Sequence, residues 1–412
     1  MTDPAGPPPA ALPAGSKDVL PVEAGELRVV EAAVRARFDA FGYREVMTPV
    51  LEYADVLDRA QEGRLRDAFR LFDESGRVLV LRPDLTIPIA RLVATRMADH
   101  PGPVRVSYLA RAFRPPAPGR PSPAEQRQAG VELLGDGGPG ADAEVLALLV
   151  GALRAAGLPD PRVGVGDVSL TAAVLEGSGV PEASRAPLGA ALAARNVVEW
   201  RRLARAAAPD AALLAELPSL RGGRELVERI AREVPAAAGA AGRLGATLDL
   251  LDRHGVGDAV VLDLGVLREW HYYSGIVFEA YAPGVGAPIA QGGRYDGLGG
   301  RFGRGRPAVG FGITLDLLHQ ALLAAGNGAA PARDGVVLVG ALDDDPAAGE
   351  AVRAAGVPVV ALAASAGDPE GLAAADGWRW VARRAPDGYT VLDRVAGTSR
   401  TLARLEEVLT PS

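Results

Sequence analysis

Apolar side chains recur at helical spacing near the start of the chain and form a single stripe. Positions three and four residues apart lie on one face of a helix. The stripe consists of Leu27, Val30, Val34, Phe38 and Phe41. Gly42 follows directly, and glycine readily ends a helix in the left-handed backbone conformation. The pattern predicts an amphipathic helix that ends before Gly42, with a strand over residues 44–52 after it.

Runs of aliphatic and β-branched residues predict the strands of a sheet further along the chain. Residues 78–81 form one run, which leads through a Pro-Asp turn into a helix that opens near Thr86. Residues 104–114 and 126–135 form two more, joined by a proline-rich loop, and predict an antiparallel hairpin. Further strands are expected at 258–265, 272–283 and 307–314, the last running into a helix.

Changes in composition along the chain predict its division into domains. The expected parts are a flexible leader at 1–12, a core at 13–325, a helical insertion in the core at about 168–256, a linker at 326–334 and a small α/β domain at 335–412. The insertion is expected because the chain becomes Ala- and Leu-rich there. The last part alternates strand and helix patterns, with a final helix expected over 399–409.

Composition and charge narrow the function classes. The 412 residues are 48% hydrophobic and 23% charged, with a net charge of -7, which gives no general reason to expect nucleic-acid or membrane binding. The absence of cysteine excludes disulfides and thiolate metal sites, and the four histidines lack the spacing of a helical metal pair. No stretch approaches the ~20 apolar residues of a membrane helix. We therefore expect a cytoplasmic protein with no metal, no cofactor and no membrane partner.

Polar side chains gather along and after the predicted strands, and their types suit an amino acid as ligand. Carboxylates bind an ammonium group, and arginine binds a carboxylate. The candidate pocket residues are Asp84, Thr86, Arg114, Gln128, Glu132, Arg268, Tyr272 and Tyr273. The sequence GGRYDGL adds Arg294 and Tyr295 after two glycines. Taken singly, each of these residues is explained more simply as a surface ion-pair partner or a strand end.

The order of several motifs resembles the class II histidyl-tRNA synthetase family over nearly the whole chain. The segments that carry the resemblance are PAGSKDVLP, LRPDLT, AFRPPAPGRPSPAEQRQAGVELLG, LREWHYYSGIVFE, GGRYDGL and AVGFGITLDLL. Several motifs in order are more specific than one alone. The resemblance implies an α+β fold, namely a class II synthetase-like antiparallel sheet flanked by helices, with a helical insertion and a small C-terminal α/β domain.

The chain departs from the synthetases at positions that contact ATP in that family. Their third class II motif ends in an arginine that holds the triphosphate, and Leu317 stands at that position here. A leucine neither neutralises nor hydrogen-bonds a phosphate. Arg114 of the second motif is followed by Pro115 and Pro116 instead of an aromatic residue and a glutamate. The histidine-specific motif keeps Arg268 and both tyrosines, so the histidine-contacting half is better preserved.

The C-terminal domain carries a charge that opposes RNA binding. Synthetases of this family bind tRNA with a terminal α/β domain. Residues 331–412 here hold eight arginines, no lysine and twelve aspartates or glutamates. A surface that meets a phosphate backbone is usually basic, so no tRNA partner is expected.

These features resemble a catalytically silent branch, the regulatory subunits of short-form ATP phosphoribosyltransferase, the first enzyme of histidine biosynthesis. The resemblance implies a hetero-oligomer with a short-form catalytic subunit, activation of that subunit, feedback inhibition by histidine as effector, and no catalytic residue in this chain. It also implies self-association as a dimer, with residues 23–52 as a candidate interface. Histidine is expected either in the candidate pocket or at the subunit interface.

Two other functions stay open from the sequence. An active histidyl-tRNA synthetase, or a related histidine-adenylating ligase, would need an arginine from elsewhere in place of the missing one, for example Arg301, Arg304 or Arg306. An unrelated scaffold that keeps only the fold would bind no histidine. Histidine-dependent exchange of pyrophosphate with ATP distinguishes a ligase from a regulatory subunit.

Overall fold

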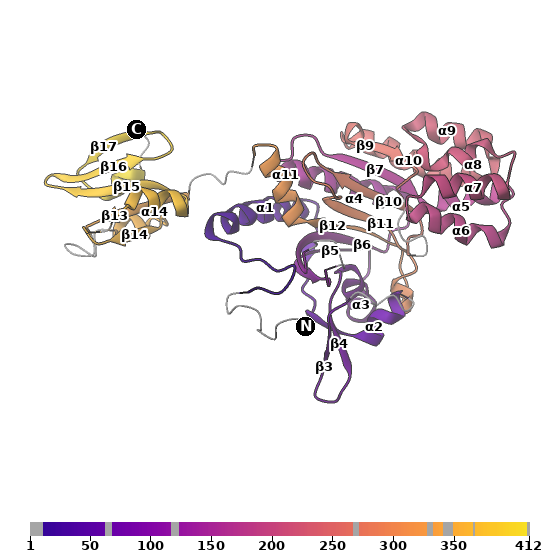
Figure 1. Ribbon diagram of the computed structural model, residues 1–412, viewed down its shortest axis with the longest axis horizontal. Coiled ribbons are helices and arrows are strands. Elements are labelled where there is room, and N and C mark those ends of the chain that lie inside the picture. The colour runs from indigo at the N-terminus through magenta and orange to yellow at the C-terminus, as the bar shows by residue number, and fades with distance from the viewer. Residues whose placement is uncertain are drawn as a thin grey trace, which may run out of the picture. The chain divides into compact units, whose positions relative to one another are not determined.

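The computed structural model describes residues 11–61, 68–116, 123–266, 272–327, 333–340, 349–365 and 367–409 (Figure 1). Contacts between residues divide the chain into two compact units. The larger consists of residues 1–17 and 29–328, and the smaller consists of residues 18–28 and 329–412.

Within the described residues, a sheet of nine strands forms the centre of the larger unit. Its strands, in spatial order, are β1 (Arg44–Glu45), β5 (Val104–Phe113), β6 (Glu125–Leu134), β12 (Ala308–Thr314), β11 (Ala290–Arg294), β10 (Ile276–Tyr281), β7 (Arg162–Asp167), β9 (Val260–Asp263) and β8 (Arg221–Gly222). The strands from β5 to β7 are antiparallel to their neighbours, whereas β1 and β9 lie parallel to β5 and β7. The pair β5–β6 is the predicted hairpin.

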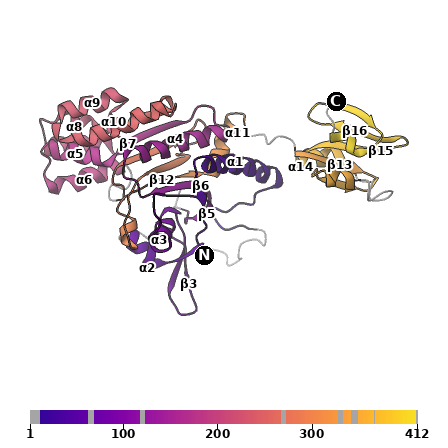
Figure 2. The same cartoon turned by 180° about the vertical axis from the view of Figure 1, so that it is seen from behind.

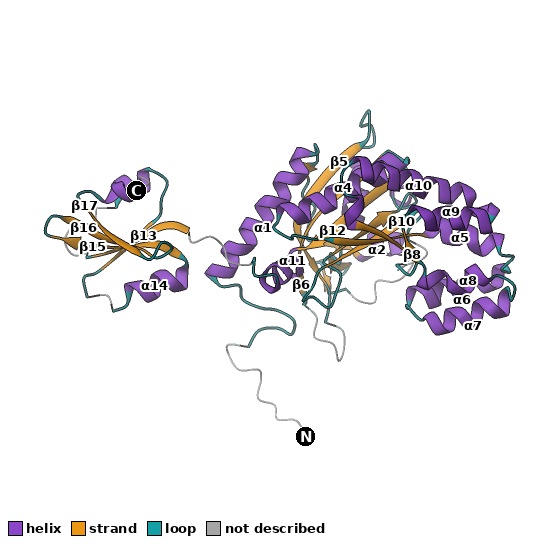
Figure 3. Ribbon diagram, turned by 90° about the horizontal axis from the view of Figure 1, so that it is seen from above, coloured by secondary structure: helices purple, strands orange, loops and turns teal. Residues whose placement is uncertain are grey.

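One face of this sheet packs on helices and holds the main hydrophobic core. Side chains alternate between the two faces of a strand, so residues 129, 131 and 133 of β6 enter this core. The helices on this side are α1 (Pro21–Ala40), α4 (Pro139–Ala155), α10 (Ala238–Arg253) and α11 (Leu315–Ala324) (Figures 2 and 3). Val30, Val34 and Phe38 of the α1 stripe are buried in this core, and Phe38 contacts Phe311 with 5.8 Å between ring centroids. Gly42 follows the helix at φ +78°, as predicted.

The opposite face of the sheet packs on a smaller layer. It consists of α2 (Ala54–Gln61), α3 (Thr86–Arg96) and a short sheet in the order β2 (Leu51–Tyr53), β4 (Val78–Leu81), β3 (Arg70–Phe72). Ile87 of α3 and Val106 and Tyr108 of β5 belong to its buried cluster. The hairpin of β3 and β4 extends away from α2 and α3 (Figure 1). The strand predicted over 44–52 is instead two short strands, because Pro49 between them has no N–H to donate to a sheet.

The predicted helical insertion lies between β7 and β9. It contains α5 (Val168–Gly177), α6 (Glu182–Ala193), α7 (Val197–Ala207), α8 (Ala212–Glu216), α9 (Arg224–Glu233) and α10, with 3-10 turns at Leu217–Ser219, Pro235–Ala237 and Gly257–Ala259. Asp167 caps α5 by accepting a hydrogen bond from the Leu170 N–H at 2.8 Å. The insertion also contributes the two-residue strand β8 to the sheet by pairing with β9, which its composition does not predict.

The described part of the smaller unit is built on a five-stranded sheet. Its strands, in spatial order, are β14 (Val359–Leu362), β13 (Arg333–Val339), β15 (Trp378–Ala385), β16 (Gly388–Asp393) and β17 (Thr398–Leu402). β13 is parallel to both neighbours, and β15, β16 and β17 are antiparallel. α13 (Glu350–Ala354) packs on one face of this sheet, and α14 (Pro369–Asp376) packs on the other.

The helix predicted over residues 399–409 is wrong. The structure has β17 followed by a 3-10 turn, Leu405–Leu409, over that stretch. Thr398 and Thr401 favour extended backbone, and Leu402 is buried in the core between the sheet and α13. Packing against β16 therefore outweighs the local helical pattern.

Candidate functional site

The face of the large sheet opposite the main core has a floor of glycines. Strand pairing places Gly130 of β6 opposite Gly312 of β12, and Glu132 opposite Gly310. A Cβ at Gly310 would lie 1.7 Å from Oε2 of Glu132, and a Cβ at Gly312 would lie 2.9 Å from the Tyr108 hydroxyl. The glycines that precede α11 therefore make room for an acidic and an aromatic side chain on this face.

Glu132 is the most deeply buried acid of the predicted set, with 1% of its surface exposed. Its Oε2 accepts a hydrogen bond from the Tyr295 hydroxyl, and Oε1 has no partner at hydrogen-bonding geometry within the described ranges. Burial raises the pKa of this carboxyl group to about 8, and the charge of Asp84 adds to that effect. The hydrogen bond from Tyr295 and the nearby Thr86 hydroxyl act in the opposite direction and lower the pKa. The group is therefore largely protonated at neutral pH.

Asp84 and Thr86 stand at the start of α3, where the sequence places the turn into a helix. Oδ1 of Asp84 accepts a hydrogen bond from the Ile87 N–H at 3.0 Å, so it satisfies one of the unpaired amides at the helix start. Both side chains are half-buried, and both act on the pKa of Glu132. The structure thus brings Asp84, Thr86 and Glu132 together.

Four tyrosines gather on the same face. The rings of Tyr272 and Tyr273 meet edge to face, with 4.9 Å between centroids, and Tyr272 stacks on Tyr295 at 5.7 Å. Tyr108 is buried, and the charges of Glu132 and Asp84 add to burial in raising its pKa. Tyr108 is not among the predicted pocket residues. The register of the β5–β6 hairpin, which pairs Tyr108 with Gly130, is the signal that would have placed it.

Of the three remaining predicted residues, the structure describes Gln128 and Arg114. Gln128 is half-buried on β6 and pairs with Thr314, two residues from Gly130 on the same face. Arg114 is exposed, and its Nε donates to the Pro83 carbonyl oxygen at 2.8 Å, which ties the end of β5 to the segment before Asp84. Arg268 lies outside the described residues.

Arg294 does not join this pocket. Its side chain extends from β11 into the main core, and only 1% of its surface is exposed. Its Nη2 lies 2.7 Å from Oδ1 of Asp142, and its Nη1 lies 3.0 Å from Oδ1 of Asp296. Side-chain alternation explains the difference, because Arg294 and its neighbour Tyr295 follow opposite faces of the strand. Of the pair in GGRYDGL, only Tyr295 contacts the candidate pocket.

Leu317, the predicted lost ATP-contact position, is half-buried in the first turns of α11 and packs against the main core. The preceding residue, Asp316, forms an ion pair with Arg127 of β6, with Nη1 and Oδ1 2.8 Å apart, and also accepts from the Arg127 backbone N–H. This start of a helix therefore holds a carboxylate with its own cation and an aliphatic side chain.

The arginines of GGRFGRGRPA are at the other end of β12 from Leu317. Arg301 Nη1 donates to the carbonyl oxygens of Arg59 and Ala60 at 3.0 Å. Arg306 Nη2 donates to the Ala98 carbonyl oxygen at 2.7 Å, in the segment that follows α3. The seven residues of β12 separate these arginines from α11 by roughly 23 Å. Arg301 and Arg306 thus hold neighbouring segments in place and are far from the Leu317 position.

Two further tests apply to the part of the chain that the structure describes. None of its helices is both long and apolar enough to cross a membrane. It also contains no group of three or more histidine, aspartate or glutamate side chains placed to hold a metal ion.

Comparison with known proteins identifies the family. Residues 15–318 match the histidyl-tRNA synthetase family. The ATP phosphoribosyltransferase regulatory subunit of Rubrobacter xylanophilus is 42% identical over 388 residues, which cover 91% of each chain. The subunit of the same name from Moorella thermoacetica is 41% identical and covers 81% of this chain and 87% of its own. The chain belongs to the family of ATP phosphoribosyltransferase regulatory subunits.

Solved structures agree with this membership. A crystal structure from Bacillus halodurans, described as an ATP phosphoribosyltransferase regulatory subunit/histidyl-tRNA synthetase, matches with a TM-score of 0.78 at 31% identity over 89% of this chain and 97% of that chain. The histidyl-tRNA synthetase of Nostoc sp. PCC 7120 matches with a TM-score of 0.80 at 20% identity over 96% and 97% of the two chains, which shows the fold alone. The predicted α+β, class II synthetase-like fold is confirmed.

Proposed function

We propose that this chain is the non-catalytic regulatory subunit of a short-form ATP phosphoribosyltransferase and acts at the first step of histidine biosynthesis. It is needed for the activity of the catalytic subunit and for feedback inhibition by histidine. Relatives that carry this name at 41% and 42% identity support the role. The leucine at position 317 supports the separation from catalysis, because no guanidinium there can hold a triphosphate.

Histidine is proposed to bind in the candidate pocket, and Glu132 is the observation that carries this proposal. Its buried Oε1 has no hydrogen-bond partner within the described ranges, its Oε2 accepts from the Tyr295 hydroxyl, and the Tyr295 ring stacks on Tyr272. An imidazole N–H satisfies such an oxygen, and a flat ring stacks on tyrosine faces. Asp84 supplies the charge for the ammonium group. Arg114, together with Arg268, is the proposed partner of the carboxylate.

Regulation requires that histidine binds two states of the complex with different affinities. The candidate pocket is suited to this, because its residues come from different layers. Asp84 and Thr86 belong to the start of α3, whereas Glu132 belongs to the large sheet. A ligand that bridges them favours the arrangement in which α3 and β6 lie closest.

Reconstitution with a short-form catalytic subunit tests the proposal. Phosphoribosyl transfer is measured with each chain alone and with both, with and without histidine. We expect activity only in the mixture, and inhibition of that activity by histidine. Equal activity of the catalytic subunit alone would reject the regulatory role.

A variant separates the pocket from the subunit interface as the place where histidine binds. Glu132→Gln should keep activation and weaken inhibition by histidine about tenfold or more, since it alters a buried hydrogen-bonding group. Glu176→Gln, an exposed position on α5, is the matched control. Unchanged inhibition of Glu132→Gln would place the effector elsewhere, with the subunit interface as the next candidate.

An active histidine-adenylating ligase is the alternative, because the family that matches residues 15–318 is a synthetase family. Histidine-dependent exchange of pyrophosphate with ATP by the purified chain would establish it. We expect no exchange, since Leu317 carries no charge and both Arg301 and Arg306 bind backbone carbonyls at the far end of β12.

We also propose that the chain pairs with a second copy through the short sheet and the segment before it. Side chains there are apolar and exposed: Met47 is 83% exposed, Leu51 42%, Leu71 42% and Phe72 74%. Exposed apolar side chains gathered on one small sheet and its flanking segment mark an interaction site. Met47 and Leu51 lie within the predicted interface at residues 23–52. No tRNA partner is proposed.

A further inference from the structure

A second pocket lies within the helical insertion, where α6 and α7 approach the end of β9. Its volume is about 110 Å³, and none of its lining residues belongs to the candidate histidine pocket. Leu192, Trp200 and Pro218 form an apolar wall. Trp200 is fully buried and donates its Nε1–H to the Leu214 carbonyl oxygen at 2.7 Å. Its polar edge is thereby satisfied, and the buried indole supports the apolar wall from behind.

Two arginines on the rim are held by carboxylates of the sheet. Arg195 donates from Nη2 to the buried carboxylate of Glu279 and, at 2.9 Å, to the Tyr281 hydroxyl. Arg221 donates from Nε to Oδ2 of Asp263 at 2.9 Å. Each guanidinium carries five N–H donors. Among the described residues, these partners engage one nitrogen of each guanidinium, which leaves further donors at the rim.

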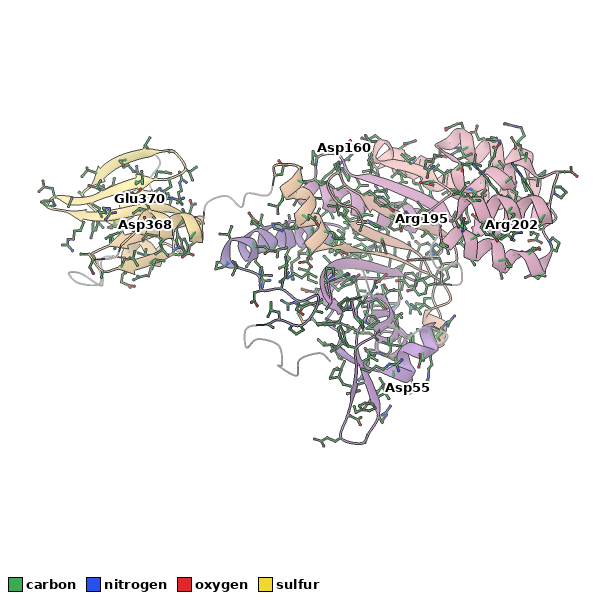
Figure 4. The ribbon with its side chains drawn as sticks, in the orientation of Figure 1. Asp55, Asp160, Arg195, Arg202, Asp368 and Glu370 are labelled. Carbon is green, nitrogen blue, oxygen red and sulfur yellow. The ribbon has the colours of Figure 1, made fainter. Side chains whose placement is uncertain are left out.

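The backbone of Arg195 adopts a left-handed conformation, which is energetically unfavourable for any residue with a side chain. Its φ is +53°, and it is the one described residue other than glycine with a positive φ. Such a conformation costs on the order of 1 kcal/mol or more and persists where surrounding contacts hold it. The pairing with Glu279 provides that hold, so the turn between α6 and α7 is built to present this guanidinium. Figure 4 shows Arg195 where the insertion meets the strands, with Arg202 further out on α7.

Each side-chain acceptor oxygen of Asn196 and Asp263 at the pocket already has a donor. Oδ1 of Asn196 accepts from the Glu199 N–H at 3.0 Å, so its amide nitrogen is the group that stays available, as a donor. Oδ1 of Asp263 accepts from the Gly265 N–H at 2.9 Å, and Oδ2 accepts from Arg221. A rim rich in donors and poor in acceptors, next to an apolar wall, selects a ligand with an anionic acceptor and an apolar body.

We propose that this pocket binds a small carboxylate with a flat apolar body, its carboxylate on Arg195 and Arg221 and its body against the apolar wall of the pocket. An apolar cavity of about 150 Å³ encloses benzene, so this pocket of about 110 Å³ encloses part of such a ring, and the rest of the ligand lies at its open side. The proposal does not depend on the regulatory role. A bound carboxylate would join the α6–α7 turn to β8.

Benzoate is the probe, and benzamide is the control of the same shape without the charge. Isothermal titration of the full-length chain should show saturable binding of benzoate and at least tenfold weaker binding of benzamide. Arg221→Met should weaken benzoate binding about tenfold. Arg221 is mostly exposed, so this variant is expected to fold, which far-UV circular dichroism checks.

Two further variants define specificity. Arg202→Met, on the same helix as Trp200 but outside the pocket, should bind benzoate as the wild type does. Glu132→Gln should also bind benzoate normally, which keeps this test separate from the histidine pocket. The proposal is overturned if benzoate gives no saturable binding, if benzamide binds equally well, or if Arg221→Met has no effect.

Discussion

Glu132 keeps its proton at neutral pH because α3, the tyrosines and the sheet exclude water from its carboxyl group. The pKa of about 8 lies well above the 4.5 of a solvated glutamate. Between those values the folded chain binds a proton that the unfolded chain releases. The free energy of unfolding therefore falls as the pH rises through this window.

The raised pKa of Glu132 therefore predicts that the stability of the folded chain falls with rising pH, which can be measured. From about pH 6.5 to pH 8, Glu132 should cost the folded chain about 2 kcal/mol. Thermal unfolding of the wild type should show a falling midpoint over this range, and Glu132→Gln should show a flatter profile. Asp142, whose pKa is raised to about 6, titrates mainly below pH 6.5. Parallel profiles for the two proteins would show that another group titrates.

Gly310 gives a second prediction at the scale of one residue. A methyl group there would lie 1.7 Å from Oε2 of Glu132, so Gly310→Ala must displace the carboxyl group. We expect about 1–3 kcal/mol of destabilisation in urea unfolding and loss of histidine binding by calorimetry. Gly286→Ala, with open space around the added Cβ, is the control and should change stability by less than about 0.5 kcal/mol. Normal histidine binding in Gly310→Ala would argue against this pocket.

At the scale of elements, the sequence predicted correctly those helices, strands and turns whose formation depends on residues within one short segment. The stripe on α1, the β5–β6 hairpin and the strand–turn–helix at Thr86 each follow from spacing and turn residues within a short segment. The predictions failed where distant contacts decide, as for residues 399–409, which pair with β16. For the same reason Tyr108 was missed and Arg294 was placed beside the pocket. Both depend on strand register and facing, which a single segment does not specify.

The Arg294–Asp142 pair joins β11 to α4 and supports the core side of the sheet. Arg294→Met would leave the buried Asp142 without its cation, which should cost about 3–5 kcal/mol in urea unfolding. The double variant Arg294→Met with Asp142→Leu should recover a good part of that loss. Arg202→Met, an exposed ion pair, is the control and should change stability by less than about 0.5 kcal/mol. A small effect of Arg294→Met alone would mean that water reaches Asp142.

At the scale of the whole molecule, self-association can be tested with one exposed residue. Phe72 is 74% exposed on the β3–β4 hairpin, so Phe72→Asp should leave the fold intact and convert a dimer into a monomer in light scattering after size exclusion. Val198→Asp, 80% exposed on α7, is the matched control and should stay dimeric. A dimeric Phe72→Asp would remove the short sheet from the interface.

The nine-stranded sheet has outermost strands, β1 and β8, of two residues each. Strands so short offer an incoming chain almost no row of unpaired amides and carbonyls, which is how natural sheets avoid templated growth. Filament formation by the native protein would thus have to begin somewhere other than its largest sheet. Concentrated folded stocks should accordingly stay free of thioflavin-positive deposits.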